Sequence, residues 1–537
     1  MDAFQQTCEK LKKIRTREDL KLRELRHLKK TYTDFGGQER PLVIRQYQIQ
    51  GMMHLVLMRR FMLGDDTGIG KTIQAIAALC YGWEKNPDRK AVILTTKSAT
   101  KQWAEEFSKF TKGIRVILCR GTPGERAAAR QRWETSTGPT VIIMGYGSAR
   151  QDFTKIQEWA DYSLVCDEAT VFKSPTAQIH QIVKYLSDQA YRAWGLSATL
   201  IKNNLMEGYG IYRVLVPGLF QMTERQFMFY YAMVRMQTVA KGRQIPVIEG
   251  YMPQKIREFK NNIDPYYLGR PKHEVATELP ALLPPIRLEV DMTPEQDAKY
   301  GETLDGFLEV GKVGEEVTKE ITQLTAITYC QQIANSLGTL DLTTKKSPKL
   351  QLLLDLLTEG DLAGANVIVF TRFRKMIDLI MPALAKAGVD AVRITGTENE
   401  DKREAAKAAF QDPRQKTRVA CITTAGSDAI NLQAAEAIIC IDTPWSAGDF
   451  LQLLGRMIRI GSVHERVQVF HMLARSKRFP KTVDHRVMDV LNSKMDLLEA
   501  VLGKRLKGDR TERTIRVEKD ISTLFQALRA DAQTSQK

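Results

Sequence analysis

The stretch LGDDTGIGKT, residues 63–72, has the residue types and spacing needed to hold the phosphates of a nucleotide. It follows an apolar, strand-like run and precedes a helical pattern. Glycines at 68 and 70 allow backbone N–H groups to approach phosphate oxygens without a Cβ clash. Lys71 can neutralise the β- and γ-phosphates, and Thr72 can bind Mg²⁺. The match is imperfect, because the strict phosphate-loop pattern has glycine at the position of Asp65.

Two adjacent carboxylates, Asp167 and Glu168, end the apolar run in LVCDEAT at 164–170. Carboxylates that end a buried strand lie at the C-terminal edge of a parallel sheet, where α/β folds bind ligands. Asp167 would hold Mg²⁺ directly or through water, and Glu168 would orient and deprotonate an attacking water. An acidic pair after a strand is common by chance, so its position downstream of a phosphate-binding stretch gives it weight.

A pair of arginines, Arg456 and Arg459, lies three residues apart in LLGRMIRIG at 453–461, a spacing that predicts one face of a helix. From a second α/β lobe, such a pair can reach a γ-phosphate when the lobes close and stabilise the transition state as arginine fingers. The alternative is a pair of solvated surface arginines, and the spacing alone favours that alternative.

The composition indicates a globular protein with a polyanionic partner. The 537 residues include 79 Lys and Arg against 63 Asp and Glu, giving a net charge of +16, and 43% are hydrophobic. This excludes a wholly disordered chain and leaves room for several domains. No apolar run approaches the roughly 20 residues of a spanning helix, so we expect no membrane association. The seven cysteines form no CxxC pair, which argues against a disulfide framework or structural zinc.

Short apolar runs alternate with helical patterns in two regions, about 40–215 and 347–475. This alternation predicts an α/β fold with two parallel sheets. The stretch between them is rich in aromatic and helical segments. Residues 482–503 predict an amphipathic helix, and residues 1–36 predict one or two basic helices.

In this order, the motifs resemble those of superfamily 2 helicases, and within them the SWI/SNF-type double-stranded DNA translocases, of a compact branch found in phages, viruses and bacteria. The resemblance runs from about residue 42 to 503. The segments that carry it are IRQYQIQGMMHL (44–55, the adenine-reading segment), LGDDTGIGKT (motif I), TTKSATKQWAEEF (95–107, Ia), VIIMGYGSAR (141–150, Ib), CDEATVFKSPTAQ (166–178, II), WGLSATLIKNNLMEGYGIYRVLVPGLF (194–220, III), YYLGRPKHEV (266–275, the linker), VIVFTRFRKMIDLI (367–380, IV), TTAGSDAINLQAA (423–435, V), DTPWSAGDFLQLLGRMIRIGS (442–462, VI) and TVDHRVMDVLNSKMDLLEAVLG (482–503, the brace helix).

The resemblance implies a P-loop NTPase core of two RecA-like parallel-sheet lobes with a mostly helical insertion and a C-terminal brace helix. The expected parts are a basic helical N-terminal segment (1–40), lobe 1 with the helicase ATP-binding motifs (41–220), a helical insertion and inter-lobe linker (221–346), lobe 2 with the helicase C-terminal motifs (347–480), and the brace helix with a basic tail (481–537).

The resemblance also assigns roles to individual residues, with ATP and Mg²⁺ as cofactors. The expected catalytic residues are Lys71, Asp167, Glu168, Gln452, Arg456 and Arg459. The expected nucleotide-binding residues are Arg45, Gln48, Asp66, Thr67, Gly68, Ile69, Gly70, Lys71 and Thr72, with Thr72 and Asp167 on the metal. The expected coupling residues are Ser197, Ala198, Thr199 and Gly426. The expected nucleic-acid contacts are Thr96, Lys97, Thr371, Arg372 and Thr423.

The sequence departs from the family pattern in four motifs. An acidic residue in place of the first motif I glycine, as at Asp65, is itself typical of the family. Thr170 stands where the family usually has His, so hydrolysis is expected to couple differently to motif III. The other departures are SAT at 197–199 in place of GTP, Ser427 and Ala429 in place of glycines, and Ile458 in place of His. The catalytic lysine, carboxylates and arginines are all present, which implies an active ATPase.

The function that the resemblance implies is ATP-dependent translocation on double-stranded or forked DNA, with fork remodelling or displacement of bound protein. Backbone phosphate contacts would make binding salt-sensitive and sequence-tolerant. One alternative is a strand-separating helicase for DNA or RNA. Another is a non-hydrolysing nucleic-acid-binding subunit, against which the intact Lys71, Glu168 and Arg459 argue. The expected location is the cytoplasm of a prokaryotic or phage-infected cell, or the nucleus of a eukaryote, and the sequence names no protein partner or pathway.

Overall fold

The computed structural model describes residues 25–33, 39–201, 204–238, 244–275, 280–310, 316–340, 346–424, 432–458, 462, 464–502 and 515–516. The chain divides into two compact units. The first comprises Met1–Tyr231, Gln254–Thr277 and Ala500–Asp509, and the second comprises Ala232–Pro253, Glu278–Glu499 and Arg510–Lys537. Each unit contains a seven-stranded parallel sheet, as the alternating sequence pattern predicts. No helix in the described ranges is both long and apolar enough to cross a membrane.

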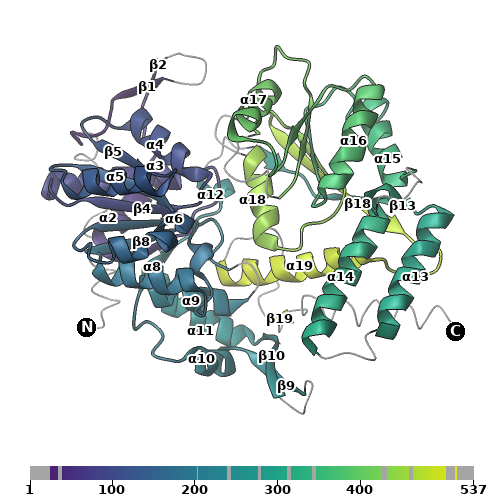
Figure 1. Ribbon diagram of the computed structural model, residues 1–537, viewed down its shortest axis with the longest axis horizontal. Coiled ribbons are helices and arrows are strands. Elements are labelled where there is room, and N and C mark those ends of the chain that lie inside the picture. Colours follow the sequence, from purple (N-terminus) through teal and green to yellow (C-terminus); the bar gives the residue numbers. More distant parts are fainter. Residues whose placement is uncertain are drawn as a thin grey trace. The chain divides into compact units, whose positions relative to one another are not determined.

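The sheet of the first unit has the strand order β11-β3-β8-β7-β4-β6-β5. Its strands are continuous apolar runs, such as TVIIMG in β6, which is buried at every position because helices cover both faces. Helices α3 and α4 lie on one face, and α6 and α8 lie on the other (Figure 1). The strands are β3 (Arg60–Leu63), β4 (Ala91–Thr95), β5 (Arg115–Cys119), β6 (Thr140–Gly145), β7 (Ser163–Asp167), β8 (Arg192–Leu196) and β11 (Tyr267–Leu268). The helices are α2 (Gln46–Leu57), α3 (Lys71–Lys85), α4 (Ala99–Phe110), α5 (Pro123–Glu134), α6 (Tyr146–Gln151), α7 (Phe153–Ile156), α8 (Gln178–Gln189), α9 (Leu205–Leu215), α10 (Glu224–Tyr231), α11 (Pro253–Ile263) and α12 (Lys272–Val275).

The sheet of the second unit has the order β12-β18-β17-β14-β16-β15, and β13 also pairs with β18. Helix α16 lies on one face of this sheet, and α17 and α18 lie on the other (Figure 1). The strands are β12 (Ala281–Leu282), β13 (Ile286–Asp291), β14 (Val367–Phe370), β15 (Ala391–Ile394), β16 (Val419–Ile422), β17 (Ala437–Cys440) and β18 (Arg466–Arg475). The helices are α13 (Pro294–Val310), α14 (Glu316–Asn335), α15 (Pro348–Thr358), α16 (Arg374–Lys386), α17 (Glu400–Gln411), α18 (Ala447–Met457) and α19 (Val483–Leu502).

The amphipathic helix expected at 482–503 is confirmed as α19. Its apolar residues Val483 and Val487 are fully buried in a cluster with Tyr300 of α13 and Ile327 of α14. Apolar side chains at this spacing form one stripe of a helix, and the stripe is buried against a neighbour. Helix α19 therefore braces the helical part of the second unit.

The expectation of a helical N-terminal segment is wrong for the part that the structure describes. Residues 31–33 form strand β1 (Thr31–Thr33), which pairs antiparallel with β2 (Glu39–Pro41). Leu28 forms a bridge to Thr111, and its side chain is buried. A Thr-Tyr-Thr run favours a strand once tertiary contacts are available, which overrides weak helical spacing. Residues 1–24 and 34–38 lie outside the described part.

The interval 221–346 contains the expected helices, but it also contains strands that the sequence analysis did not predict. They include a hairpin of β9 (Met233–Thr238) and β10 (Gln244–Tyr251), with β19 (Ile515–Arg516) paired to β10. Strand β11 extends the first sheet, whereas β12 and β13 extend the second. The interval expected to be a linker is thus divided between the two units.

Candidate nucleotide-binding site

The loop between β3 and α3 has the backbone geometry of a phosphate cradle. Gly68 and Gly70 have φ values of 85° and 87°, a left-handed conformation that favours glycine. A Cβ on Gly70 would lie 2.5 Å from Nε2 of Gln48, so a side chain at this position would also clash. The Lys71 ammonium donates hydrogen bonds to the backbone carbonyls of Asp65 (2.9 Å) and Asp66 (3.2 Å). These residues fit a nucleoside triphosphate, because the lysine and the first N–H groups of α3 lie at one loop and can bind phosphate oxygens together.

The expected base-reading residue, Gln48, is fixed by the phosphate loop itself. Its Nε2 donates a hydrogen bond to the carbonyl of Ile69 (3.1 Å), and its Oε1 accepts one from the backbone N–H of Arg45 (3.0 Å). Gln48 is 6% exposed. The structure therefore brings together Arg45 and Gln48, at the N-terminus of α2, with the loop that the sequence assigns to phosphate binding.

Asp167 ends β7 and is held by two side chains of other elements. Its Oδ2 accepts hydrogen bonds from Thr95 Oγ1 (2.9 Å) and Trp103 Nε1 (2.8 Å). Both bonds use Oδ2 and hold the carboxylate in place, and Asp167 is the residue expected to hold Mg²⁺. Tyr146 donates its hydroxyl to the Asp167 carbonyl (2.7 Å), and burial raises the pKa of Tyr146 well above its usual range, which keeps it a donor. Trp103 lies in the segment that resembles motif Ia, but it was not among the predicted site residues.

Glu168 has φ 53° and ψ 56°, a left-handed conformation that is strained for a residue with a side chain. Such conformations cost on the order of 1–3 kcal/mol and persist where the surroundings impose them, often at active sites. The backbone changes conformation between the two adjacent carboxylates. Asp167 continues the strand, whereas Glu168 begins the turn that leads into the 3₁₀ helix Ala169–Phe172.

The acidic residue in place of the usual glycine, Asp65, is fully buried and anchors the loop. Its Oδ1 accepts hydrogen bonds from Nε (2.9 Å) and the backbone N–H (3.2 Å) of Arg270, and its Oδ2 accepts from Nη2 of Arg270 (2.5 Å) and Nε2 of Gln74 (3.0 Å). Arg270 is more than two hundred residues away in the chain. It lies in the segment YYLGRPKHEV, but no local sequence signal marks it as a partner of Asp65.

The expected coupling segment, Ser197 to Thr199, follows β8 and is buried. The hydroxyl of Ser197 donates a hydrogen bond to the carbonyl of Thr199 (2.8 Å), and the Ser197 N–H donates to the carbonyl of Leu63 at the end of β3 (3.2 Å). The segment therefore lies beside the start of the phosphate loop. Gly426 lies outside the described residues.

The expected nucleic-acid contacts differ in accessibility. Lys97 and Arg372 are exposed, whereas Thr96 is half-buried and Thr423 is buried. Thr371 is fully buried, and its hydroxyl donates to Oδ2 of Asp442 (2.5 Å). The Thr371 side chain thus has an internal structural role, which does not favour the expected phosphate contact.

In the second unit, Gln452 and Arg456 lie on α18 and are half-buried. Helix α18 ends at Met457, and its C-cap Ile458 has a non-helical ψ of 89°. The expected shared helix face of Arg456 and Arg459 is therefore wrong, because the helix ends before Arg459. Arg459 lies outside the described residues.

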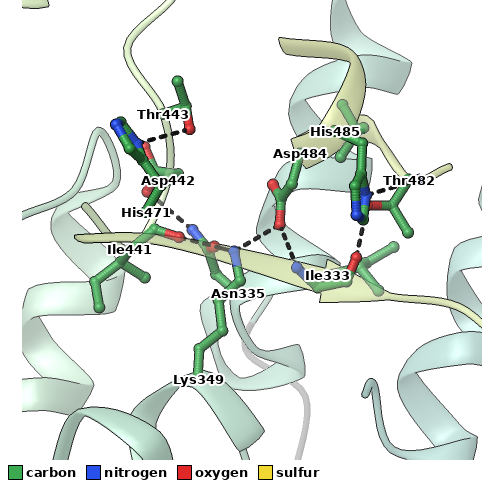
Figure 2. Close-up of polar contacts among 12 residues, drawn as sticks. Ile333, Asn335, Lys349, Ile441, Asp442, Thr443, His471, Thr482, Asp484 and His485 are labelled. Carbon is green, nitrogen blue, oxygen red and sulfur yellow. Dashed lines mark hydrogen bonds and ion pairs between the residues drawn. The ribbon is translucent and has the colours of Figure 1, made fainter. Parts of the chain in front are cut away.

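A buried polar network supports the loops that follow β14 and β17 in the second unit (Figure 2). The Lys349 ammonium, 1% exposed, donates to Oδ2 of Asp484 (2.7 Å), Oδ1 of Asn335 (3.0 Å) and the carbonyl of Ile441 (2.7 Å). Asn335 in turn donates to Oδ2 of Asp442 (3.0 Å). Buried charges are tolerated when all their hydrogen bonds are made, as for Lys349 here. The network joins α14, α15, α19 and the start of the segment that leads to α18.

Two protein-family models match long stretches of this chain. Residues 47–346 match the SNF2-related domain family, and residues 348–461 match the helicase conserved C-terminal domain. The chain is 25% identical over 456 residues to the ISWI chromatin-remodeling complex ATPase CHR17 of Arabidopsis thaliana, covering 82% of this chain and 41% of that protein. It is 25% identical over 475 residues to the chromodomain-helicase-DNA-binding protein 1-like of Danio rerio, covering 86% of this chain and 44% of that protein.

A solved SWI2/SNF2 ATPase core of Sulfolobus solfataricus, in complex with dsDNA, is 23% identical with a TM-score of 0.41, covering 86% of this chain and 93% of that chain. The chain spans less than half the length of the two curated relatives described. The SNF2-related match alone covers more than half of the sequence, and the helicase C-terminal match follows it directly. The chain therefore belongs to the SNF2-related family and contains an SNF2-type ATPase and helicase core.

Proposed function

We propose that this protein hydrolyses ATP to move along double-stranded DNA. The observation that carries the proposal is the meeting of two sets of groups at the C-terminal edge of one parallel sheet. The left-handed glycines and Lys71 follow β3, and the Asp167–Glu168 pair follows β7. This edge is where open α/β sheets bind their ligands.

The residues of the first unit divide the chemistry between them. Lys71 and the N–H groups at the start of α3 would bind the β- and γ-phosphates, and Thr72 and Asp167 would hold Mg²⁺. When bound, the metal neutralises negative charge on the reacting phosphates. Glu168 orients the attacking water and accepts its proton. Arg456 and Arg459 of the second unit stabilise the charge that develops in the transition state.

The nucleic-acid partner follows from charge and from the family. The net charge of +16 favours a polyanion, and Lys97 and Arg372 are exposed cations on the two units. The relatives named above are a chromatin-remodeling complex ATPase and a chromodomain-helicase-DNA-binding protein. Contacts to the phosphate backbone would set the affinity for DNA without dependence on base sequence. We therefore expect the protein to move along duplex DNA of any sequence.

The decisive experiment is steady-state ATP hydrolysis at matched salt, without nucleic acid and with single-stranded, double-stranded and forked DNA and RNA. Strong stimulation by plain duplex supports the proposal, and displacement of a triplex-forming strand by the ATP-driven protein then tests movement directly. Stimulation only by single strands, forks or RNA replaces the proposal with a strand-separating helicase or a fork remodeller. Hydrolysis that no nucleic acid stimulates contradicts the proposal.

A further inference from the structure

We propose that Arg270 is a positioning residue that holds the base-binding and phosphate-binding parts of the nucleotide site in a fixed relation. The inference rests on the proposed function in one respect, namely that the site binds ATP. Arg270 follows β11, the short strand that pairs with β3 at the edge of the first sheet. It is 8% exposed, and its side chain bonds to three elements that surround the site.

The three elements are α2, the phosphate loop and α3. On α2, Nη1 of Arg270 donates to the Tyr47 carbonyl (2.5 Å) and to Gln50 Oε1 (3.2 Å). On the loop, the guanidinium of Arg270 donates hydrogen bonds to both carboxylate oxygens of Asp65. On α3, Nη2 donates to Gln74 Oε1 (3.1 Å).

The backbone around Arg270 reinforces this junction. The Asp66 N–H donates to the Arg270 carbonyl (3.1 Å), and the Gly64 N–H donates to the Leu268 carbonyl (2.6 Å). Gly51 allows α2 to come this close, because a Cβ there would lie 1.8 Å from Gln74 Oε1 and 2.8 Å from Arg270 Nη2. The glycine at position 51 therefore lets α2 pack directly against the Arg270 and Gln74 side chains.

A fixed relation matters because ATP is held at two places. The family resemblance assigns the base to Gln48 on α2 and the phosphates to Lys71 and the loop glycines, and Gln48 donates to the carbonyl of Ile69 in that loop. A ligand gains the full benefit of two sets of contacts only when the protein holds them at the right separation beforehand. A lysine in place of Arg270 would keep a cation beside Asp65 of the phosphate loop but lose the contacts to α2, so the contribution of the base should fall more than phosphate binding does.

The test measures equilibrium binding to the full chain carrying Arg270→Lys. The probes are fluorescent mant-ATP and mant-GTP, with inorganic tripolyphosphate as a competitor that lacks a base. We expect the preference for the ATP probe over the GTP probe to fall roughly tenfold, a change of about 1.4 kcal/mol, while the affinity for tripolyphosphate changes less than about twofold. Equal weakening of all three ligands, or an unchanged preference, would overturn the proposal, as would a wild-type protein without a preference for adenine.

A matched control separates positioning from general stability. Arg126 and Asp152 form another buried two-point ion pair in the same unit, with Nε to Oδ2 at 2.9 Å and Nη2 to Oδ1 at 3.0 Å. Arg126→Lys should lower the melting temperature as Arg270→Lys does, but it should leave the base preference unchanged. If Arg126→Lys lowers the preference to the same extent, the effect is a stability effect and the proposal fails.

Two further variants keep the test independent of folding and of catalysis. If Arg270→Lys does not fold, Gln50→Ala removes a contact to α2 without leaving a buried charge, and it should lower the preference about two- to threefold. Gln48→Ala should lower the preference by itself, and adding Arg270→Lys to it should cause no further loss, because the two act through one contact. Additive losses would contradict the proposal. Because binding is measured, an absence of ATP hydrolysis would remove the proposed function without affecting this result.

Discussion

At the scale of single residues, the site combines a strained backbone with a tightly held carboxylate. Among the described residues other than glycine, only Asp161 and Glu168 have positive φ. The strain at Glu168 coincides with the position to which the water-activating role is assigned. Asp167 beside it is instead restrained through its side chain by Thr95 and Trp103. The two carboxylates can therefore have different roles although they are adjacent in the sequence.

The first residue-scale prediction separates binding from hydrolysis. Lys71→Ala should abolish both ATP binding and turnover, because it removes the cation that neutralises the β- and γ-phosphates. Glu168→Gln should keep ATP bound but lower turnover at least 100-fold, because the amide cannot accept a proton from water. Turnover and mant-ATP binding measure the two effects, with the exposed Glu158→Gln as the control. Wild-type turnover by Lys71→Ala would rule out the site.

The second residue-scale prediction concerns Trp103, whose indole N–H donates a hydrogen bond to Asp167. Trp103→Phe keeps the aromatic ring but leaves Thr95 as the one remaining side-chain donor among the described residues. We expect the Mg²⁺ concentration for half-maximal hydrolysis to rise roughly tenfold, as is usual when a group that orients a metal ligand is removed. A Mg²⁺ titration of the ATPase rate measures the shift. Trp159→Phe is the matched control, since its indole donates to Glu134 instead (2.8 Å), and an equal shift in both variants would contradict the role of Trp103.

At the scale of elements, local patterns predicted the buried strands of the two sheets but not the strands within 221–346 or the contacts between elements. Runs such as TVIIMG in β6 form strands in the regions where alternation predicted parallel sheets, because a strand buried on both faces is continuously apolar. The pairing of Asp65 with Arg270 and that of Trp103 with Asp167 join distant segments, and no periodicity reports such contacts. Strand β13 was missed for a related reason, since its half-exposed edge position gives a mixed pattern. The end of α18 before Arg459 shows that spacing alone does not establish a shared helix face.

An element-scale prediction concerns His471 on β18, which is 2% exposed and lies near Thr443 and the ring of Phe450. Burial, together with the nearby charge of Arg287, lowers its pKa to about 4. An unfolded histidine has a pKa of about 6.5, so the unfolded state binds more protons between these values. This contribution to stability is complete above pH 6.5 and is lost as the pH falls toward 4, by about 2 kcal/mol between pH 7 and 5.

His471→Gln should therefore flatten the pH dependence of the unfolding free energy between pH 7 and 5. Urea unfolding of both proteins at several pH values measures the difference. His464→Gln in the same unit is the control and should leave the slope unchanged. A variant slope equal to that of the wild type would show that His471 is not buried in its neutral form.

At the scale of the whole molecule, the expected catalytic residues are divided between two compact units. Lys71, Asp167 and Glu168 belong to the first unit, and Gln452 and Arg456 belong to the second. One family match ends at residue 346 and the other begins at 348, whereas the boundary between the units in this part of the chain lies at Thr277 and Glu278. Hydrolysis is then expected to depend on residues that neither unit supplies alone.

The whole-molecule prediction tests this dependence with Arg459→Ala. If Arg459 stabilises the transition state across the units, its loss should lower kcat by roughly 10³ while changing the affinity for ADP less than about threefold, because the first unit still binds the nucleotide. Duplex-stimulated ATP turnover and mant-ADP binding measure the two quantities. Arg414→Ala is the control, since Arg414 is an exposed arginine of the same unit that pairs with Asp412 (2.9 Å). Near-normal turnover by Arg459→Ala would make Arg459 a surface arginine and leave Arg456 as the candidate finger, whereas a parallel loss of ADP affinity would place Arg459 in ground-state binding.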